Sequence, residues 1–501
     1  MGRTEESLKA KTAKGLFWGG MNNGVQQLLG LAFGIILGRL LDPSDFGMTA
    51  MLAVFSVIAN ELQSSGFKTG LVNMKSPQHE DYNAVFWFNI GMGVVLYVLL
   101  WFLAPLIADY YHQPKLIPLS RYVFLGFVFS SFGMAQSAWL TKQMKIKQIA
   151  QCGMTATLTS SIVSVILAAL GFGYWALATQ YLLYIVVNTL LMWRFSAWRP
   201  THLQFDHLQF TIYKPLRRLF PFSSKIMVSA IFTQVNNNIM NLLLGHYYGE
   251  TNTGHYNQAY QWSSKCFLLV GNMLRQVDQT VLVNLREERE RQLAVLRKMM
   301  RFTAFISFPL LFGLGLVSHE FIVLAIGEKW AFSASLLPLL CLCGAFMPLS
   351  TLLTDSVISQ KRSDIYLWNT LVLGLLQAGL MVALWRQGIY TMVTAYTLLN
   401  IGWLMVWHFF VKRLMGYGLL AFLKDIVPFA FAAAGVMVVT GWVTELIVDR
   451  LEFTNDYLRL WTLLISRVVM AAVLYYAVMR LSGAVILKEC LEFARRFGRQ
   501  K

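Results

Sequence analysis

The sequence predicts an all-α protein that crosses a membrane about fourteen times, and three observations carry this prediction. Of 501 residues, 56% are apolar or aromatic and only 13% are charged, whereas soluble domains carry about 25% charged residues. Apolar runs of helical length recur along the whole chain, each close to the roughly 20 residues that span a bilayer. Lys and Arg are abundant in every second connection between these runs and sparse in the others, as expected for a chain that crosses a membrane repeatedly. The composition excludes a soluble enzyme, a disordered chain and a secreted disulfide scaffold.

The apolar runs define the expected spans in order. They lie near residues 15–38, 46–65, 85–107, 117–138, 150–170, 175–193, 222–244, 255–275, 302–325, 333–355, 365–385, 390–410, 426–447 and 460–479. The eighth run is the least hydrophobic. The first run is too long for a signal peptide and lacks a small-residue cleavage site, so we expect it to be a span.

The basic residues orient these spans. The two tails and the even-numbered connections hold 32 of the 42 Lys and Arg residues, and the odd-numbered connections hold 7. Because basic residues favour the cytoplasmic side, both termini are expected to be cytoplasmic. The net charge of +17 is therefore a topology signal, and no nucleic acid partner is expected.

The connections are too short for an extramembrane domain that carries chemistry. Three segments mix apolar and basic positions at helical spacing and are expected to lie at the cytoplasmic interface. They are residues 203–220, 414–424 and 484–497, and a solvated loop is an equally good interpretation of the first two. The five cysteines form neither a disulfide framework nor a metal site, so we expect no cofactor.

The chain contains an internal repeat. The first run is followed by LGRLLDPSDFG and the seventh by LGHYYGETNTG, so that Gly38 matches Gly245 and Gly47 matches Gly254 at a common offset of 207 residues. Two six-span halves in the same orientation follow, related by a pseudo-twofold axis along the membrane normal. The expected domains are a six-helix bundle over 1–200, a second bundle over 201–413, and two further helices with a basic tail over 414–501.

Several short motifs together resemble a known family. They are AKTAKGLFWGG, GRLLDPSDFG, YNQAY at 256–260, FPLLFGL at 308–314, GEKW at 327–330 and the run from Leu339 to Asp364. Their order over nearly the whole chain resembles the polysaccharide transporter family of the MOP exporter superfamily, most closely the Wzx-type flippases of the colanic acid exporter type. The resemblance implies a MATE-like fold of two six-helix bundles.

The resemblance also implies a function and partners. Such a protein exports a polyprenyl-pyrophosphate-linked oligosaccharide repeat unit across a bacterial inner membrane for surface polysaccharide synthesis. Its partners are that lipid-linked oligosaccharide, membrane lipids and other polysaccharide assembly proteins. The family offers no shared catalytic motif, so the candidate site residues come from the physical interpretation alone.

A polar stripe marks the seventh span. Lys225, Ser229, Thr233, Asn237 and Asn241 follow one another at four-residue spacing, which places them on one slowly drifting helix face. The first span carries Trp18, Asn22, Gln26, Gly30 and Gly34 at the repeat-related positions. We expect these two faces to line a central cavity, with helix–helix packing as the alternative interpretation.

Three cations fall inside spans and are the candidate ligands of the pyrophosphate: Lys225, Lys265 and Arg467. An intramembrane cation is costly unless it faces water, protein or an anion. Lys225 is close enough to a span end to snorkel to the surface, and Arg467 has the alternative of pairing with an acid or a lipid headgroup. Asn22, Gln26, Thr233 and Asn237 are the expected sugar-binding side chains.

Two carboxylates lie near the cytoplasmic ends of spans. Glu61 and Asp355 are candidates for carrying a coupling proton or for gating the inner mouth by pairing with Arg275 or Lys68. A partly solvated helix end is the alternative interpretation.

Two other functions compete with a flippase. A MATE-like cation-coupled drug antiporter would be expected to use intramembrane carboxylates, yet the first span has none between Gly15 and Gly38. A membrane-embedded polysaccharide polymerase or glycosyltransferase would need a large external loop or a metal-nucleotide motif, and the sequence has neither. We therefore expect a transporter and not an enzyme.

Overall fold

The computed structural model describes residues 24–64, 66–201, 214–275, 282, 285–451, 453, 455–484 and 486–489. Over these residues the chain is built from α-helices and short 3-10 turns, with no strand. In the long helix α9 the described side chains are those of 227, 228 and 230–273. The chain divides into two compact units, residues 1–254 and 255–501, and the boundary falls inside α9.

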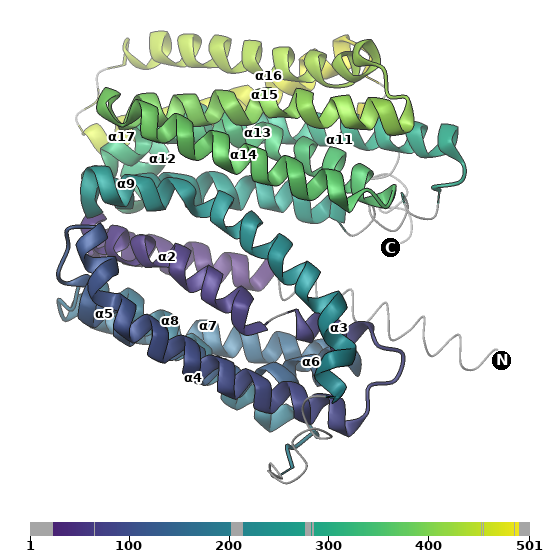
Figure 1. Ribbon diagram of the computed structural model, residues 1–501. Helices are drawn as coiled ribbons and strands as arrows, with labels where there is room; N and C mark the ends of the chain where they lie inside the picture. Colours follow the sequence, from purple (N-terminus) through teal and green to yellow (C-terminus); the bar gives the residue numbers. More distant parts are fainter. Residues whose placement is uncertain are drawn as a thin grey trace. The chain divides into compact units, whose positions relative to one another are not determined.

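The first unit contains the N-terminal helices and the first part of α9 (Figure 1). Its elements are Gly24–Leu40, α2 (Pro43–Ser64), α3 (Phe67–Asn73), α4 (His79–Tyr110), α5 (Leu116–Ser131), α6 (Met134–Lys142), α7 (Ile146–Ala169), α8 (Tyr174–Phe195) and α9 (Lys214–Arg275). Helices α2, α4, α5 and α8 share an apolar core that includes Met51, Leu119 and Phe124.

The second unit contains the end of α9 and the remaining helices. They are α11 (Arg289–Leu316), α12 (Ser318–Ile326), α13 (Ala331–Ser359), α14 (Ser363–Leu384), α15 (Ile389–Met415), α16 (Leu419–Val448) and α17 (Asp456–Leu481). Helix α13 is the centre of this unit, because it packs against α11, α12, α14 and α15. Hydroxyls link it to its neighbours: Ser307 Oγ on α11 donates to the Ala345 carbonyl at 2.8 Å.

The expected spans correspond to helices throughout the described residues. Ten helices are long and apolar enough to cross a membrane, and the pair α5–α6, bent by 46°, makes an eleventh. The described part of the first expected span lies in the shorter helix Gly24–Leu40, and the seventh and eighth lie on either side of the kink at Gly249 in α9. The prediction of an all-α polytopic membrane protein is confirmed.

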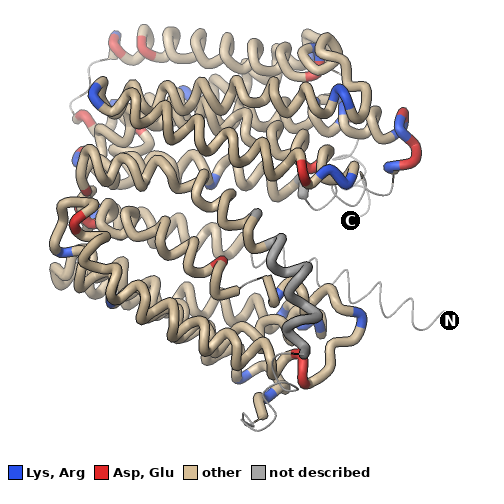
Figure 2. The backbone as a smooth tube through the Cα atoms, in the orientation of Figure 1, with Lys and Arg blue, Asp and Glu red and all other residues tan. Residues whose placement is uncertain are grey.

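Charged residues concentrate near helix ends within each unit, and the middles of the helices are largely uncharged (Figure 2). This distribution is the one that a bilayer imposes, because an unpaired charge is costly in hydrocarbon. The few charges that do lie within the expected spans are therefore candidates for function or for buried ion pairs.

Two breaks in the helices have local causes. Gly249 interrupts α9 with φ 75° and ψ −176°, a backbone conformation open essentially to glycine alone. Between α5 and α6 the chain bends at Gly133, and the indole Nε1 of Trp193 donates to the Phe132 carbonyl at 2.7 Å. That bond satisfies a carbonyl at the break, as a low-dielectric environment demands.

The expected interfacial segments differ in outcome. Most of residues 203–220 lies outside the described residues. Residues 414–424 are not a separate helix, because Gly416 ends α15 in the left-handed conformation and Leu419 begins α16. In the third segment, 486–489 is helical, and Glu489 pairs with Lys298 of α11 at 2.7 Å.

Candidate functional site

The polar face of α9 begins in the first unit. Thr233 is half-buried, Asn237 is exposed and Asn241 is buried, so the stripe rotates as it descends the helix. The Asn241 Oδ1 has no donor among the described residues. The side chain of Lys225 lies outside what the structure describes, as does Asn22; Gln26 is described and half-buried in the helix Gly24–Leu40.

Glu61 on α2 contacts this part of α9. Gln234 Nε2 donates to Glu61 Oε1 at 3.4 Å, a neutral amide in place of the expected cation. The Arg275 side chain lies outside the described residues. Burial lowers the pKa of Lys68, which lies in the short helix α3, because desolvation penalises the ammonium form. Asp355 is half-buried on α13 in the other unit.

The two corresponding segments of the internal repeat, the start of α2 and the part of α9 just after Gly249, touch each other inside the first unit. A Cβ built on Gly47 would overlap the Glu250 carbonyl, and a Cβ built on Gly254 would overlap the Pro43 carbonyl. Pro43 and Glu250 are themselves related by the repeat offset. The contact is thus reciprocal, as a twofold relation requires, and glycine at both positions lets the backbones meet.

Lys265 lies on the part of α9 that belongs to the second unit. Its Nζ is 4.4 Å from the centre of the Trp262 ring, and Trp262 is buried and packs edge-on against Phe321. Lys265 is half-buried and makes no ion pair with a described residue within 4 Å. The aromatic face stabilises the ammonium form only in part, so this position can also accept an anion as a partner.

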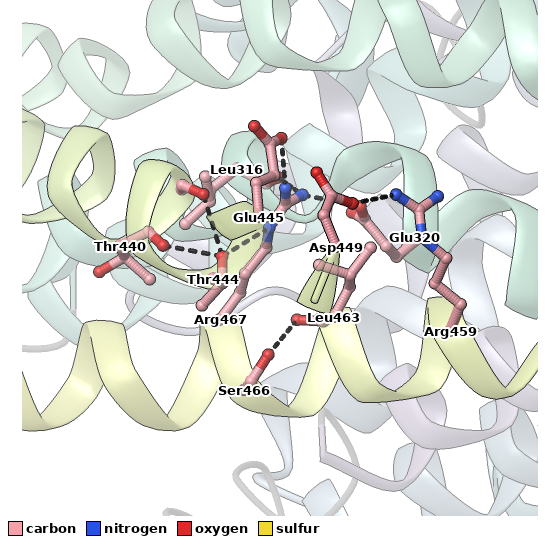
Figure 3. A network of polar contacts seen from close by, with 11 residues as sticks. Leu316, Glu320, Thr440, Thr444, Glu445, Asp449, Arg459, Leu463, Ser466 and Arg467 are labelled. Carbon is pink, nitrogen blue, oxygen red and sulfur yellow. Dashed lines mark hydrogen bonds and ion pairs between the residues drawn. The ribbon is translucent and has the colours of Figure 1, made fainter. Parts of the chain in front are cut away.

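Arg467 on α17 is held by two carboxylates (Figure 3). Its Nη1 lies 2.7 Å from Glu320 Oε1 of α12 and its Nη2 lies 2.8 Å from Glu445 Oε1 of α16. Arg467 and Glu320 are 8% and 5% exposed, whereas Glu445 is 60% exposed. Of the two alternatives for Arg467, pairing with an acid is therefore what the structure has. Its role as a substrate ligand stays a prediction.

An apolar groove of about 610 Å³ runs beside this cluster within the second unit. Its walls come mainly from α11 and α17, and Arg467 forms part of the lining. Other lining residues include Phe305, Pro309, Gly313, Val468 and Tyr475. The groove can accept a hydrocarbon chain but offers few polar partners to a sugar.

Two acidic groups were not anticipated from the sequence. Glu320 falls inside the ninth apolar run, and the need to neutralise Arg467 was a signal that would have singled it out. Asp425, 3% exposed, accepts from Arg297 Nε at 2.7 Å and from the Tyr417 hydroxyl at 2.9 Å. Asp425 neutralises basic residues of α11 and directly follows residues 414–424, the segment that the sequence marked as interfacial.

The fold and these charges together define a multi-pass membrane protein. Residues 36–335 match the model of a family described as polysaccharide biosynthesis protein. The chain belongs to that family, and the resemblance to the polysaccharide transporter family is confirmed.

Named relatives cover most of the chain. It is 27% identical to the lipopolysaccharide biosynthesis protein WzxC of Escherichia coli (strain K12), over 72% of either chain. It is 24% identical to the teichuronic acid biosynthesis protein TuaB of Bacillus subtilis (strain 168), over 81% of this chain and 83% of the relative. The succinoglycan biosynthesis transport protein ExoT of Rhizobium meliloti (strain 1021) is 23% identical over 92% of this chain and 91% of its own.

Solved structures share the fold. The lipid II flippase MurJ in an inward closed conformation superposes with a TM-score of 0.70 at 13% identity, over 92% of this chain and 98% of that chain. An inward-facing multidrug resistance MATE family transporter of the MOP superfamily gives a TM-score of 0.62 at 16% identity, over 78% and 95%. The MATE-like fold is thereby confirmed, and the named relatives, one of them a transport protein, agree with the expectation of a transporter and not an enzyme.

Proposed function

We propose that this protein moves a polyprenyl-pyrophosphate-linked oligosaccharide repeat unit from the cytoplasmic to the periplasmic face of a bacterial inner membrane. Family membership and relatives named for lipopolysaccharide, teichuronic acid and succinoglycan biosynthesis support a role in surface polysaccharide synthesis. The fold of a lipid II flippase supports a lipid-linked substrate. The charge bias of the connections supports cytoplasmic termini.

The observation that carries the proposal is the charge of Lys265. This lysine lies within an expected span, half-buried, and its close partner among the described residues is an uncharged indole ring. A cation in this environment is stabilised by an anion that visits the site. A pyrophosphate supplies such an anion, whereas a cationic drug would be repelled.

The remaining candidate residues have complementary roles in this proposal. Lys225 assists in attracting the pyrophosphate, and Asn22, Gln26, Thr233 and Asn237 hydrogen-bond the sugar hydroxyls. The apolar groove beside Arg467 holds part of the polyprenyl chain, because an apolar chain gains nothing by leaving an apolar surface for water. Glu61, Asp355 and Arg275 gate the cytoplasmic mouth.

Alternating access is the mechanism that these features favour. The two halves repeat in one orientation, and rocking of such halves exposes a central site to each side in turn. The reciprocal approach of Gly47 to Glu250 and of Gly254 to Pro43 supports a closable end on the expected periplasmic side. The sequence has no nucleotide-binding loop, so ATP does not drive the motion directly.

The test is complementation. The protein is expressed in a strain that lacks its own flippase and makes one defined lipid-linked repeat unit, and the surface polysaccharide is measured. Several repeat units are tried, since family members differ in their polysaccharide. We expect export of at least one unit. The proposal fails if a membrane-inserted protein exports none of them and confers drug efflux.

A further inference from the structure

A polar pocket opens at one end of the first unit, away from the residues assigned to transport. Its volume is about 470 Å³, within the range of about 300–1,000 Å³ that small-ligand pockets occupy. Four segments build it: the α3–α4 connection, the first turn of α4, the end of α6 and the chain after α8. The main lining residues are Lys75, His79, Tyr82, Trp139, Lys142 and Trp198.

The lining carries two ammonium groups and no carboxylate. Lys142 Nζ donates to the Val72 and Met74 carbonyls at the end of α3, which leaves one of its three hydrogens for a ligand. Lys75 is exposed and has no hydrogen bond or ion pair with any described residue. The nearby Asp81 is buried and accepts the Gln78 N–H at 2.8 Å as a helix cap, so it is engaged elsewhere.

The aromatic wall is anchored by neighbouring backbone contacts. Trp198 is 6% exposed and lies 5.7 Å from the His79 ring and 6.0 Å from the Tyr82 ring. Asn83 Oδ1 and Trp87 Nε1 bond the Thr201 backbone at 3.1 Å, which fastens the segment after α8 against α4. The Trp198 indole N–H has no acceptor among the described residues.

The pocket lies where the expected membrane surface would be. The apolar run of α4 begins just after Tyr82, near residue 85, and tryptophan and tyrosine gather at the level of lipid headgroups. Lysines at this level attract anionic lipids of the cytoplasmic leaflet. A cavity with two ammonium groups, aromatic walls and no acid therefore combines charge and depth suited to a lipid phosphate.

We propose that this pocket binds the phosphate of an anionic phospholipid headgroup from the cytoplasmic leaflet. The ligand's phosphate lies between Lys75 and the free N–H of Lys142, and its glycerol or alcohol part contacts the Trp139 and Trp198 rings. The site is separate from the proposed transport pathway. Its occupancy fixes the α3–α4 connection against α6, and it does not depend on which lipid-linked sugar is exported.

The experiment measures lipid binding by native mass spectrometry of the purified full-length protein. The probes are short-chain phosphatidylglycerol, short-chain phosphatidylcholine and inorganic pyrophosphate. The test variant is Lys75→Gln, because Lys75 caps nothing and its loss leaves the fold intact. The matched control is Lys424→Gln, an exposed lysine near the start of α16. A charge reversal, Lys75→Glu, extends the series, and unchanged thermal unfolding verifies folding of each variant.

We expect phosphatidylglycerol to bind more tightly than phosphatidylcholine. Lys75→Gln should lower the affinity for phosphatidylglycerol about fivefold and Lys75→Glu should lower it on the order of 25-fold, while Lys424→Gln should leave the affinity unchanged. If inorganic pyrophosphate binds, neither phospholipid binds, and the pyrophosphate binding depends on Lys75, the ligand is a soluble phosphate compound and the lipid assignment is overturned. Equal losses in Lys75→Gln and Lys424→Gln, or no loss in either, would remove the pocket as a site. None of these outcomes bears on export.

Discussion

Gly254 lies against the backbone of Gly47, and a Cβ at Gly254 would come within 3.0 Å of the Gly47 nitrogen. The two residues occupy the same position in the two copies of the internal repeat. Their neighbours meet reciprocally, Gly47 with Glu250 and Gly254 with Pro43. A sequence match at one offset has thus become a symmetric contact, and glycine is required there because any side chain would occupy the space of a carbonyl.

Gly254→Ala should therefore separate the start of α2 from the part of α9 around Gly254. The added methyl group would overlap the Pro43 carbonyl, and backbone cannot yield as a flexible side chain can. In the proposed cycle this change destabilises the state closed at the expected periplasmic end, and we expect export to fall at least tenfold with insertion preserved. Export in the complementation assay and membrane level by immunoblot are the measurements.

Gly379→Ala is the control for that variant. Gly379 lies within α14 and has nothing within 4 Å of a built Cβ. Glycine in a helix interior costs roughly 1 kcal/mol relative to alanine, so this variant should be as stable as the parent or more so. If Gly254→Ala exports like Gly379→Ala, the close approach has no part in transport.

A reversible crosslink tests the same contact without changing its packing. Cysteines replacing Ser44 of α2 and Asn252 of α9, both half-buried and close in sequence to the touching glycines, should form a disulfide under oxidation. Because the cycle has to open this end to release substrate, export should stop and reductant should restore it. Each single cysteine variant is the control. Full export through a completely formed crosslink would rule out rocking at that end.

The sequence predicted the fold well because a bilayer leaves few choices. The described part of each of the fourteen apolar runs falls on a helix or on two helices separated by a short break, since a spanning chain has to satisfy its backbone internally. The seventh and eighth runs lie on either side of the break at Gly249 in α9, so the separation of these two expected spans agrees with the structure. In contrast, the helical spacing of apolar and basic residues over 414–424 did not reveal that residues 419–424 belong to α16 and not to a separate interfacial segment.

The site was less predictable than the fold. Its position inside an apolar run identified Arg467 as a buried cation, but its buried partner Glu320 is 147 residues away in the sequence, and its second partner, Glu445, lies on the preceding helix α16. Only the folded chain brings them together. Glu61 was singled out for its charge, yet its partner is the amide of Gln234, because a half-solvated carboxylate accepts from any donor that packing provides.

Cysteine accessibility tests the topology. Asn455, Thr251 and Ser44 should be labelled from outside, and Gln78, Glu288 and Ser363 from inside, following the bias in Lys and Arg. Thr251 is preferred to its neighbour Thr253, because Thr251 is exposed whereas Thr253 is fully buried and bonds the Gly249 carbonyl at 2.8 Å. Labelling of Thr251 and Glu288 from the same side would contradict the orientation.

Removing Arg467 should destabilise the second unit. Arg467→Met leaves Glu320 buried without its cation, and breaking a buried pair costs about 3–5 kcal/mol. Arg459→Met is the matched control, because its pair with Asp449 at 2.8 Å is 46% and 61% exposed, and such surface pairs contribute about 0–1 kcal/mol. Thermal unfolding in detergent is the measurement.

The double variant Arg467→Met with Glu320→Gln completes that cycle. Removing both charges abolishes the uncompensated carboxylate, so most of the lost stability should return. If the double variant is no more stable than Arg467→Met alone, the lost stability does not come from the unpaired Glu320. It would then come from the other contacts of Arg467, with Glu445 of α16 or with the Leu316 carbonyl of α11, 3.3 Å from Arg467 Nη1.

Lys265→Ala addresses transport itself. The ammonium has only the Trp262 ring as a close partner among the described residues, so the fold does not need its charge, and its loss should lower export strongly without lowering insertion or thermal stability. Lys265→Arg should retain part of the activity, since a guanidinium also binds phosphate. Lys115→Ala, at an exposed position between α4 and α5, should export normally. Normal export by Lys265→Ala would show that the pyrophosphate is attracted elsewhere. If the variant loses export and also unfolds at a clearly lower temperature, Lys265 is a structural residue.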